Sequence, residues 1–320
     1  MVADSGKGRT RSYIYAVYAH TLASNIALTW PQPSRSIQAD ITFAWKPPRF
    51  AFSHKLAWLH HWFDRAGTNW LASARAGNGY LLRLPGLADF WLSLDGREVR
   101  GAPGRAFRPE LLDQLLINHI LPFALTLKGF HAFHASASRI GDRAVLFLGD
   151  AGAGKSTLAA GMLARGFPPL ADDCSVVDCR NGAAAVLPSH PTLRLWPQVK
   201  AAIQGRSERL ALVDGKYTVR LKGPRNFPTK PAALSRIYVL CPQANSSTAP
   251  ALEPLTGPKA VVELVRHSYR LDFSDRPLLT RQLEGFGKLA DSIAVRRLVY
   301  SPDRQDAEAT IALVLSELKS

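Results

Sequence analysis

Hydrophobic and polar positions are spaced differently in different parts of the chain. Residues 13–28 are rich in β-forming side chains that alternate loosely with polar ones, which predicts strands. Residues 111–120 instead carry Leu and Ile at helical spacing, after a Pro109-Glu110 pair that suits the first turn of a helix. Residues 144–148, Ala-Val-Leu-Phe-Leu, form a short apolar run that is typical of a buried strand. The pattern predicts a β-rich beginning followed by mixed helices and strands.

A stretch with several Gly and Pro residues at 96–104 separates these patterns and indicates a boundary. We expect a smaller, mostly β (α+β) N-terminal domain at residues 1–108, with a role in substrate recognition, and an α/β domain at residues 109–320. A chain of 320 residues is long enough to bury both cores. The helix at the start of the second domain would join the two, and Pro122 would bend or end it.

The apolar run at 144–148 leads directly into GDAGAGKS at residues 149–156, which matches the GxxxxGK[ST] phosphate-binding loop in its required position after a strand. Glycines let backbone N–H groups turn inward and approach phosphate oxygens closely. Lys155 would neutralise the β- and γ-phosphates, and the Ser156 hydroxyl would ligate Mg²⁺. A helix follows, with its N-terminus facing the anion. The sequence therefore predicts a site for ATP and Mg²⁺ with these nucleotide-binding residues: Gly149, Asp150, Ala151, Gly152, Ala153, Gly154, Lys155, Ser156 and Thr157.

Two adjacent carboxylates, Asp172 and Asp173, follow an apolar approach at residues 168–170. Like charges so close together are costly unless something positive lies between them. Mg²⁺ and the proton of a hydroxyl group would supply that charge, with one aspartate as the base and its neighbour at the metal. The alternative interpretation is a solvated turn. His134 lies beside aromatic residues, and its neighbours alone favour a place in the core over a functional role.

The composition adds little about partners. The chain has 40 Lys and Arg against 25 Asp and Glu, a formal net charge of +15 that favours polyanionic partners. No interleaved basic and aromatic run occurs, so nucleic acid is not favoured. The cysteines form no CxxC pair and suggest buried thiols of a cytosolic protein: Cys174, Cys179 and Cys241. No apolar run reaches the roughly 18 residues of a membrane span, so we expect a cytoplasmic protein. The sequence leaves open whether it forms a homo-oligomer.

Taken together, four features resemble the catalytic domain of the HPr kinase/phosphorylase family, at matching spacing. They are His134, the loop GDAGAGKST at residues 149–157, a helix that ends in Arg165-Gly166, and Ala-Asp-Asp at residues 171–173. Later segments are similar to the shorter HPr-kinase-related proteins: residues 191–197, 234–240 and 260–270. This resemblance is much more specific than a phosphate-binding loop alone, and it implies an HPr-kinase-type P-loop fold.

The resemblance also implies roles for individual residues. Asp172 would act as the base and work with His134, while Asp173 and Ser156 would lie near the metal. Some members of the related group accompany lasso-peptide gene clusters and phosphorylate the precursor peptide at a C-terminal serine. The resemblance therefore implies an ATP-dependent serine kinase whose substrate is a peptide or small protein. Three cations are candidate contacts to phosphate or substrate, with ordinary surface charge as the alternative: Arg194, Lys216 and Arg220.

Three other functions stay open at this point. One is a kinase of an HPr-type phosphocarrier protein, although the N-terminal domain differs from the one expected there. Another is a P-loop kinase for a small hydroxyl compound, although such enzymes usually carry an arginine-rich lid. The third is a non-catalytic nucleotide-binding regulator that binds nucleic acid, which would show a steep dependence of affinity on salt.

Overall fold

The computed structural model describes residues 12–30, 32, 38–45, 56–64, 66–197, 203–213, 215–223, 225–243, 249–301 and 304–318. The chain forms two compact units, Met1–Leu115 and Leu116–Ser320. The predicted mixture of helices and strands is confirmed, with strands dominating. The domain boundary predicted after residue 108 precedes the boundary between the units and stays a prediction. Within the described ranges, no helix is both long enough and apolar enough to span a membrane.

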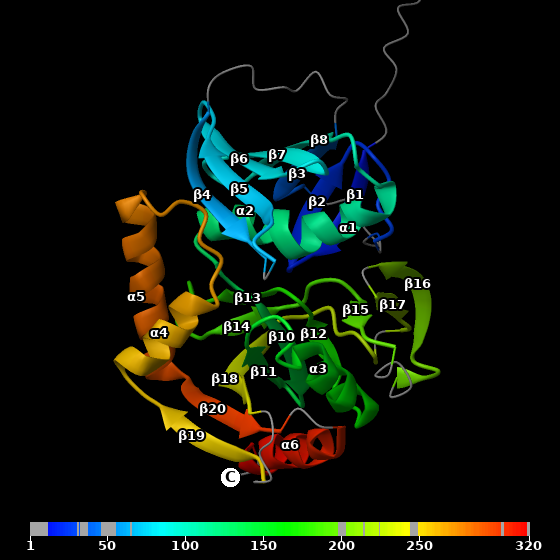
Figure 1. The fold of residues 1–320 in the computed structure, drawn as a ribbon, viewed down its shortest axis with the longest axis vertical. Helices are drawn as coiled ribbons and strands as arrows, with labels where there is room; N and C mark the ends of the chain where they lie inside the picture. Colours follow the sequence, from blue (N-terminus) through cyan, green and yellow to red (C-terminus); the bar gives the residue numbers. More distant parts are fainter. Residues whose placement is uncertain are drawn as a thin grey trace, which may run out of the picture. The chain divides into compact units, whose positions relative to one another are not determined.

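The first unit contains one large sheet (Figure 1). Among the described residues its strands pair in the order β1-β2-β3-β8-β7-β6-β5-β4. The segment predicted as strand at residues 13–28 forms an antiparallel hairpin of β1 and β2. The strands have these bounds: β1 Tyr13–Val17, β2 His20–Ser24, β3 Ile41–Trp45, β4 Ala57–Phe63, β5 Asn69–Arg75, β6 Gly79–Leu84, β7 Ala88–Ser93 and β8 Glu98–Pro103.

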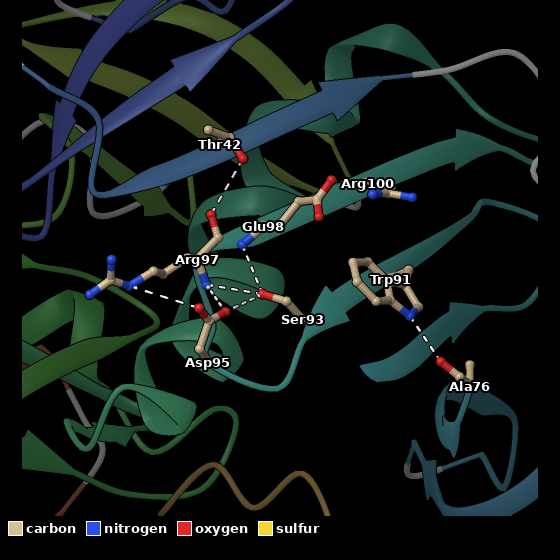
Figure 2. A network of polar contacts seen from close by, with 8 residues as sticks. All are labelled: Thr42, Ala76, Trp91, Ser93, Asp95, Arg97, Glu98 and Arg100. Atoms are coloured by element: carbon tan, nitrogen blue, oxygen red, sulfur yellow. Dashed lines mark hydrogen bonds and ion pairs between the residues drawn. The ribbon is translucent and has the colours of Figure 1, made fainter. Parts of the chain in front are cut away.

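The turn between β7 and β8 shows how the sequence sets the register of this sheet (Figure 2). The Ser93 hydroxyl donates to Asp95 Oδ1 at 2.5 Å and accepts from the backbone N–H of Glu98 at 2.9 Å. Gly96 supplies the left-handed φ of 67° that the turn requires. The turn thereby brings Trp91 of β7 opposite Arg100 of β8, whose guanidinium lies 5.0 Å from the ring centroid.

A helical segment crosses the boundary between the units. It begins as predicted at Pro109, with a 3₁₀ turn at Pro109–Leu111 and helix α1 at Leu112–Leu115. The expectation that Pro122 bends or ends the helix is only half right, because α2 (Leu121–Leu127) continues beyond it. A π-helical stretch at Leu116–Ile120 comes immediately before α2. The wider turn absorbs the missing N–H of proline, so the helix changes its geometry without stopping.

The second unit is built on a mixed sheet in which β11 pairs in parallel with β18, and β18 in parallel with β20 (Figure 1). Among the described residues the path is β12-β10-β11-β18-β14-β13-β9, and β19 and β20 extend it beyond β18. The strands are β9 His131–Phe133, β10 Ala135–Ile140, β11 Arg143–Leu148, β12 Pro169–Ala171, β13 Ser175–Asp178, β14 Ala185–Leu187, β18 Ala232–Pro242, β19 Ala251–Leu255 and β20 Ala294–Tyr300.

Alternate side chains of β11 pack into two cores on opposite faces of this sheet. Leu146 and Leu148 join the core that includes α4 (Pro258–Arg266) and α5 (Arg276–Ser292). Val145 and Phe147 join the core that includes α3 (Lys155–Ala164) and α6 (Arg304–Glu317). Because both faces of β11 are buried, its sequence is a continuous apolar run and not an alternating one, as predicted for residues 144–148.

A separate small sheet packs against helix α3. Among the described residues it consists of β15 (Thr192–Leu195), β17 (Lys216–Leu221) and β16 (Ser207–Val213), with β17 in the centre. Leu193, Leu195 and Val219 lie in one core with Ala160 and Leu163 of the helix. Period-two alternation places Lys216, Thr218 and Arg220 together on the opposite face.

Candidate active site

The predicted phosphate-binding loop connects β11 to the first turn of α3. Gly152 and Gly154 have φ values of 85° and 89°, which a residue with a Cβ atom rarely adopts. A Cβ on Gly154 would also lie 3.0 Å from the Tyr300 hydroxyl oxygen. The loop therefore has the strand-turn-helix context and the backbone conformation that the sequence pattern predicts.

Lys155 begins α3 and is buried, with 6% of its surface exposed. Its ammonium group donates to the carbonyl oxygens of Gly149 at 2.7 Å and Asp150 at 3.0 Å. Burial lowers the pKa of Lys155 to about 8, although the charges of Asp173 and Asp172 oppose this effect. The lysine thus lies over its own loop, where a bound phosphate would offer a stronger partner than two neutral carbonyls.

The Ser156 hydroxyl donates to Oδ1 of Asp172 at 2.9 Å. Asp172 follows strand β12, and its carboxylate also accepts from the Ser136 hydroxyl at 2.7 Å and the Arg194 backbone N–H at 3.0 Å. Burial is the main cause of a raised pKa of Asp172, and the charge of Asp173 raises it further. The three hydrogen bonds act in the opposite direction. The predicted loop and the predicted acidic pair therefore meet at one buried carboxylate.

Asp173 occupies an unusual backbone position beside this carboxylate. Its φ of 62° lies in the left-handed region, where aspartate is tolerated more readily than most residues. Its carbonyl oxygen accepts a hydrogen bond of 2.9 Å from His134 Nδ1, and its carboxylate lies 3.8 Å from Arg194 Nη1. The turn directs the two adjacent carboxylates to different partners, Asp172 to Ser156 and Asp173 to Arg194.

His134 is held in one tautomer by its surroundings. A carbonyl oxygen can only accept, so Nδ1 carries the proton and Nε2 carries the lone pair. Burial, together with the charge of Lys155, lowers the pKa of His134 to about 4. The ring is therefore neutral at neutral pH. Its hydrogen bond fixes the turn at Asp173, which lies 39 positions after His134 in the sequence.

The three predicted cationic contacts lie on the small sheet, at different distances from the loop. Arg194 pairs with Thr218 across β15 and β17, which puts it on the same face as Lys216 and Arg220. Arg194 reaches the acidic pair directly. Lys216 lies 5.2 Å from the Trp196 ring centroid, and its charge is a further cause, after burial, of the lowered pKa of Lys155. Arg220 pairs instead with Glu208 at 3.3 Å.

Three residues near the loop escaped the sequence analysis. Ser136 contacts Asp172 from strand β10, and the only signal was a serine in a buried, alanine-rich strand. Tyr300, at the end of β20, donates its hydroxyl proton to the Ala153 carbonyl. Arg266, at the end of α4, pairs with Asp150 at 2.7 Å. Tyr300 belongs to no motif. Arg266 lies in the segment 260–270 that shares the resemblance, but the sequence analysis assigned it no role, because it reaches the loop only through the fold.

Magnesium and a nucleotide fit these residues. In the described part of the chain, no three His, Cys, Asp or Glu side chains converge as a metal cluster. Magnesium with a nucleotide needs fewer protein ligands, since waters and phosphate oxygens complete its octahedral shell. Adjacent ligands of such a shell, at about 2.1 Å from the ion, are separated by about 3 Å. The 2.9 Å between the Ser156 and Asp172 oxygens matches that spacing.

The comparisons with known proteins give a distant similarity. No protein-family model matches the chain, and no curated protein matches it. Among solved structures, the chain is similar to the Hpr(Ser) kinase/phosphatase from Coxiella burnetii, at 14% sequence identity and a TM-score of 0.32. The match covers 59% of this chain and 97% of that one. At this identity and TM-score, the similarity says nothing about the chemistry of this chain.

Proposed function

We propose that this chain is an ATP-dependent phosphotransferase that phosphorylates a serine hydroxyl of a peptide or small protein. The observation that carries the proposal is the contact between Ser156 of the phosphate-binding loop and Asp172 of the acidic pair, at 2.9 Å. A loop that only bound phosphate would not need a buried carboxylate beside its serine, because that charge would repel the anion. A metal ion between them removes the repulsion.

The loop supplies binding and orientation. Its backbone N–H groups and the N-terminus of α3 attract the phosphates, and Lys155 turns from the Gly149 and Asp150 carbonyls toward them. Ser156 and Asp172 would hold Mg²⁺. When bound, Mg²⁺ offsets the negative charge that a nucleophile must approach. Arg194, whose Nη1 lies 3.8 Å from Asp173 Oδ2, adds positive charge beside the acidic pair.

The hydrogen bonds favour a different division of roles within the acidic pair from the one that the resemblance implies. The Asp172 carboxylate accepts from Ser136, Ser156 and the Arg194 backbone, and it faces the loop serine that ligates magnesium in P-loop enzymes. Its raised pKa would suit a base, but its contact with Ser156 places it where the magnesium ligand of a P-loop enzyme lies. We therefore propose that Asp172 holds the metal, that Asp173 is the base, and that His134 positions the turn at Asp173.

The step proposed is a direct transfer. The acceptor hydroxyl oxygen forms a bond to the γ-phosphorus as the bond from that phosphorus to the β,γ-bridging oxygen breaks. Asp173 takes the hydroxyl proton, and ADP leaves with the electron pair of the broken bond. Lys155 balances the charge that develops on the phosphate oxygens. The products are a phosphoserine and ADP.

For the acceptor, we propose first the C-terminal serine of a lasso-peptide precursor. The support is the sequence resemblance at His134, residues 149–157 and residues 171–173, and not a contact in the structure. The experiment follows radiolabelled phosphate from ATP to three kinds of acceptor: peptides that end in serine, an HPr-type carrier protein, and small hydroxyl compounds. The Lys155→Met variant is the control for loop-dependent transfer.

Labelling of the peptides alone would support the proposal, and it should disappear in the control variant. Labelling of the carrier protein or of a small compound would instead identify the acceptor as a member of that class. Binding of ATP without transfer to any acceptor, together with salt-sensitive binding of nucleic acid, would support the non-catalytic regulator instead.

A further inference from the structure

Two cations from different elements converge on one residue of the phosphate-binding loop. The carbonyl oxygen of Asp150 accepts from the Lys155 ammonium at 3.0 Å. Its carboxylate oxygen Oδ2 accepts from Arg266 Nη2 at 2.7 Å, although Arg266 lies 116 positions later in the sequence. Lys155 belongs to the loop motif, whereas Arg266 is the last residue of α4.

The end of α4 is fixed in place beside the site. The His267 carbonyl accepts from the backbone N–H of His134 at 2.7 Å, and Ser268 forms an antiparallel bridge with Phe133. Ala260 and Leu264 anchor the helix in the core behind the sheet. The end of α4 that carries Arg266 is thus hydrogen-bonded to the backbone segment that carries His134, which leaves the Arg266 backbone little conformational entropy to lose when the side chain binds a ligand.

The ion pair of Arg266 with Asp150 is weak enough to be exchanged. The two side chains are 58% and 59% exposed, and ion pairs between such exposed groups contribute little. The terminal phosphate of a nucleoside triphosphate carries more charge than a carboxylate, and it presents oxygens that a guanidinium can contact through two parallel hydrogen bonds. A phosphate group in the loop would therefore compete successfully with Asp150 for Arg266.

We propose that Arg266 is a phosphate-contacting residue of the nucleotide site, which leaves Asp150 and binds the terminal phosphate of a nucleoside triphosphate. This inference rests on the proposed function, because it needs a triphosphate in the loop. Asp150 then acts as a placeholder that keeps Arg266 at the loop while the loop holds no phosphate. Arg266 discriminates triphosphate from diphosphate, since only the triphosphate has the group that it contacts.

The test is isothermal titration calorimetry of the full chain with MgATP and with MgADP. In the Arg266→Met variant, loss of a hydrogen bond to a charged group should weaken MgATP binding about 10- to 100-fold and MgADP binding much less. Arg266→Lys should recover part of the affinity. Asp150→Asn should bind MgATP at least as tightly as the wild type, because it frees Arg266. The matched control is Arg276→Met, which removes an exposed arginine at the start of α5.

Two results would overturn the inference while the proposed function stands. One is an equal loss of affinity for MgATP and for MgADP in Arg266→Met, which would mean that Arg266 does not contact the terminal phosphate. The other is an Asp150→Asn variant that loses as much affinity as Arg266→Met, which would mean that the ion pair serves only to hold the loop. If the wild type binds neither nucleotide, the proposed function fails and this inference fails with it.

Discussion

The Ser156 hydroxyl and the Asp172 carboxylate lie 2.9 Å apart, although 16 positions separate them in the sequence. Ser156 lies in the first turn of α3, and Asp172 follows the edge strand β12. Between β11 and β12 lies β10, which adds Ser136 to the same carboxylate. The contact makes the loop and the acidic pair parts of a single site.

Replacing Asp173 or Asp172 by asparagine should impair different properties of the enzyme, the transfer rate in one case and the magnesium requirement in the other. Asp173→Asn should lower the rate of transfer by about 10²- to 10⁴-fold with MgATP affinity nearly unchanged, because it removes the proton acceptor. Asp172→Asn should instead raise the magnesium concentration that is needed for half-maximal activity. Steady-state rates measured over a magnesium titration separate the two effects.

The opposite pattern would restore the assignment implied by the sequence resemblance. In that case Asp172→Asn would abolish transfer at every magnesium concentration, and Asp173→Asn would shift the magnesium requirement. Calorimetry with MgATP confirms in either case that the variant is folded and binds.

The two buried serines of β10 provide a matched pair for the environment of Asp172. Ser136 donates to Asp172 at 2.7 Å, whereas the Ser138 hydroxyl has no hydrogen-bond partner among the described residues. Ser136→Ala should destabilise the chain by about 1–3 kcal/mol, because a buried carboxylate loses a donor. Ser138→Ala should change stability by less than about 1 kcal/mol. Urea denaturation at pH 7 measures both, and equal effects would contradict the prediction.

The hydroxyl group of Tyr300 should by itself contribute to nucleotide binding by the loop. The Tyr300→Phe variant leaves the buried Ala153 carbonyl without this donor, and MgATP affinity should fall about 3- to 10-fold, as expected for one net hydrogen bond. Tyr238→Phe is the control, because that buried hydroxyl donates to Glu317 of α6. Unchanged nucleotide affinity in Tyr300→Phe would show that the loop holds its shape without the tyrosine.

The second unit should lose stability steeply as the pH falls from 6.5 toward 4. Burial lowers the pKa of four histidines from 6.5 to about 4 and that of His190 to about 3; the four are His119, His131, His134 and His267. The unfolded chain binds more protons than the folded one across this window, so stability is present above pH 6.5 and declines below it. The raised pKa of Asp172 acts in the other direction but belongs to a single group.

Unfolding midpoints in urea, measured from pH 7 to pH 4.5, test this pH dependence. The His190→Gln variant has one fewer buried imidazole to protonate, so its midpoint should vary less with pH than that of the wild type. A midpoint that stays constant over this range in the wild type would contradict the burial of these rings in neutral form.

The features that the sequence predicts well are those formed by neighbouring residues. The apolar run at 144–148, the glycines of the loop and the start of α3 follow one another along the chain, so local sterics and hydrogen bonding dictate their geometry. Asp172 and Asp173 directly follow the short strand β12, so their position is also set by neighbouring residues. The sequence alone could assign these residues to one site, but it could not divide the roles between them.

Pro122 shows the limit of local reasoning. A proline inside an apolar helical pattern predicts that the helix bends or ends, because proline lacks the N–H of a regular helical turn. The helix continues with Pro122 in the first turn of α2, where a proline is tolerated, and Leu116, Ile120 and Phe123 are buried on both sides of it. A π-helical stretch accommodates the proline.

The amino-acid sequence by itself determined the strand, the glycine-rich turn at residues 149–156 and the two carboxylates after it, since each is a short motif whose geometry comes from adjacent residues. Only the tertiary structure decided what surrounds them. Ser136, Arg266 and Tyr300 reach the site from a neighbouring strand, a later helix and the end of β20. No spacing along the chain encodes such contacts, because strand pairing and core packing bring Tyr300 to Ala153 across 147 positions of the sequence.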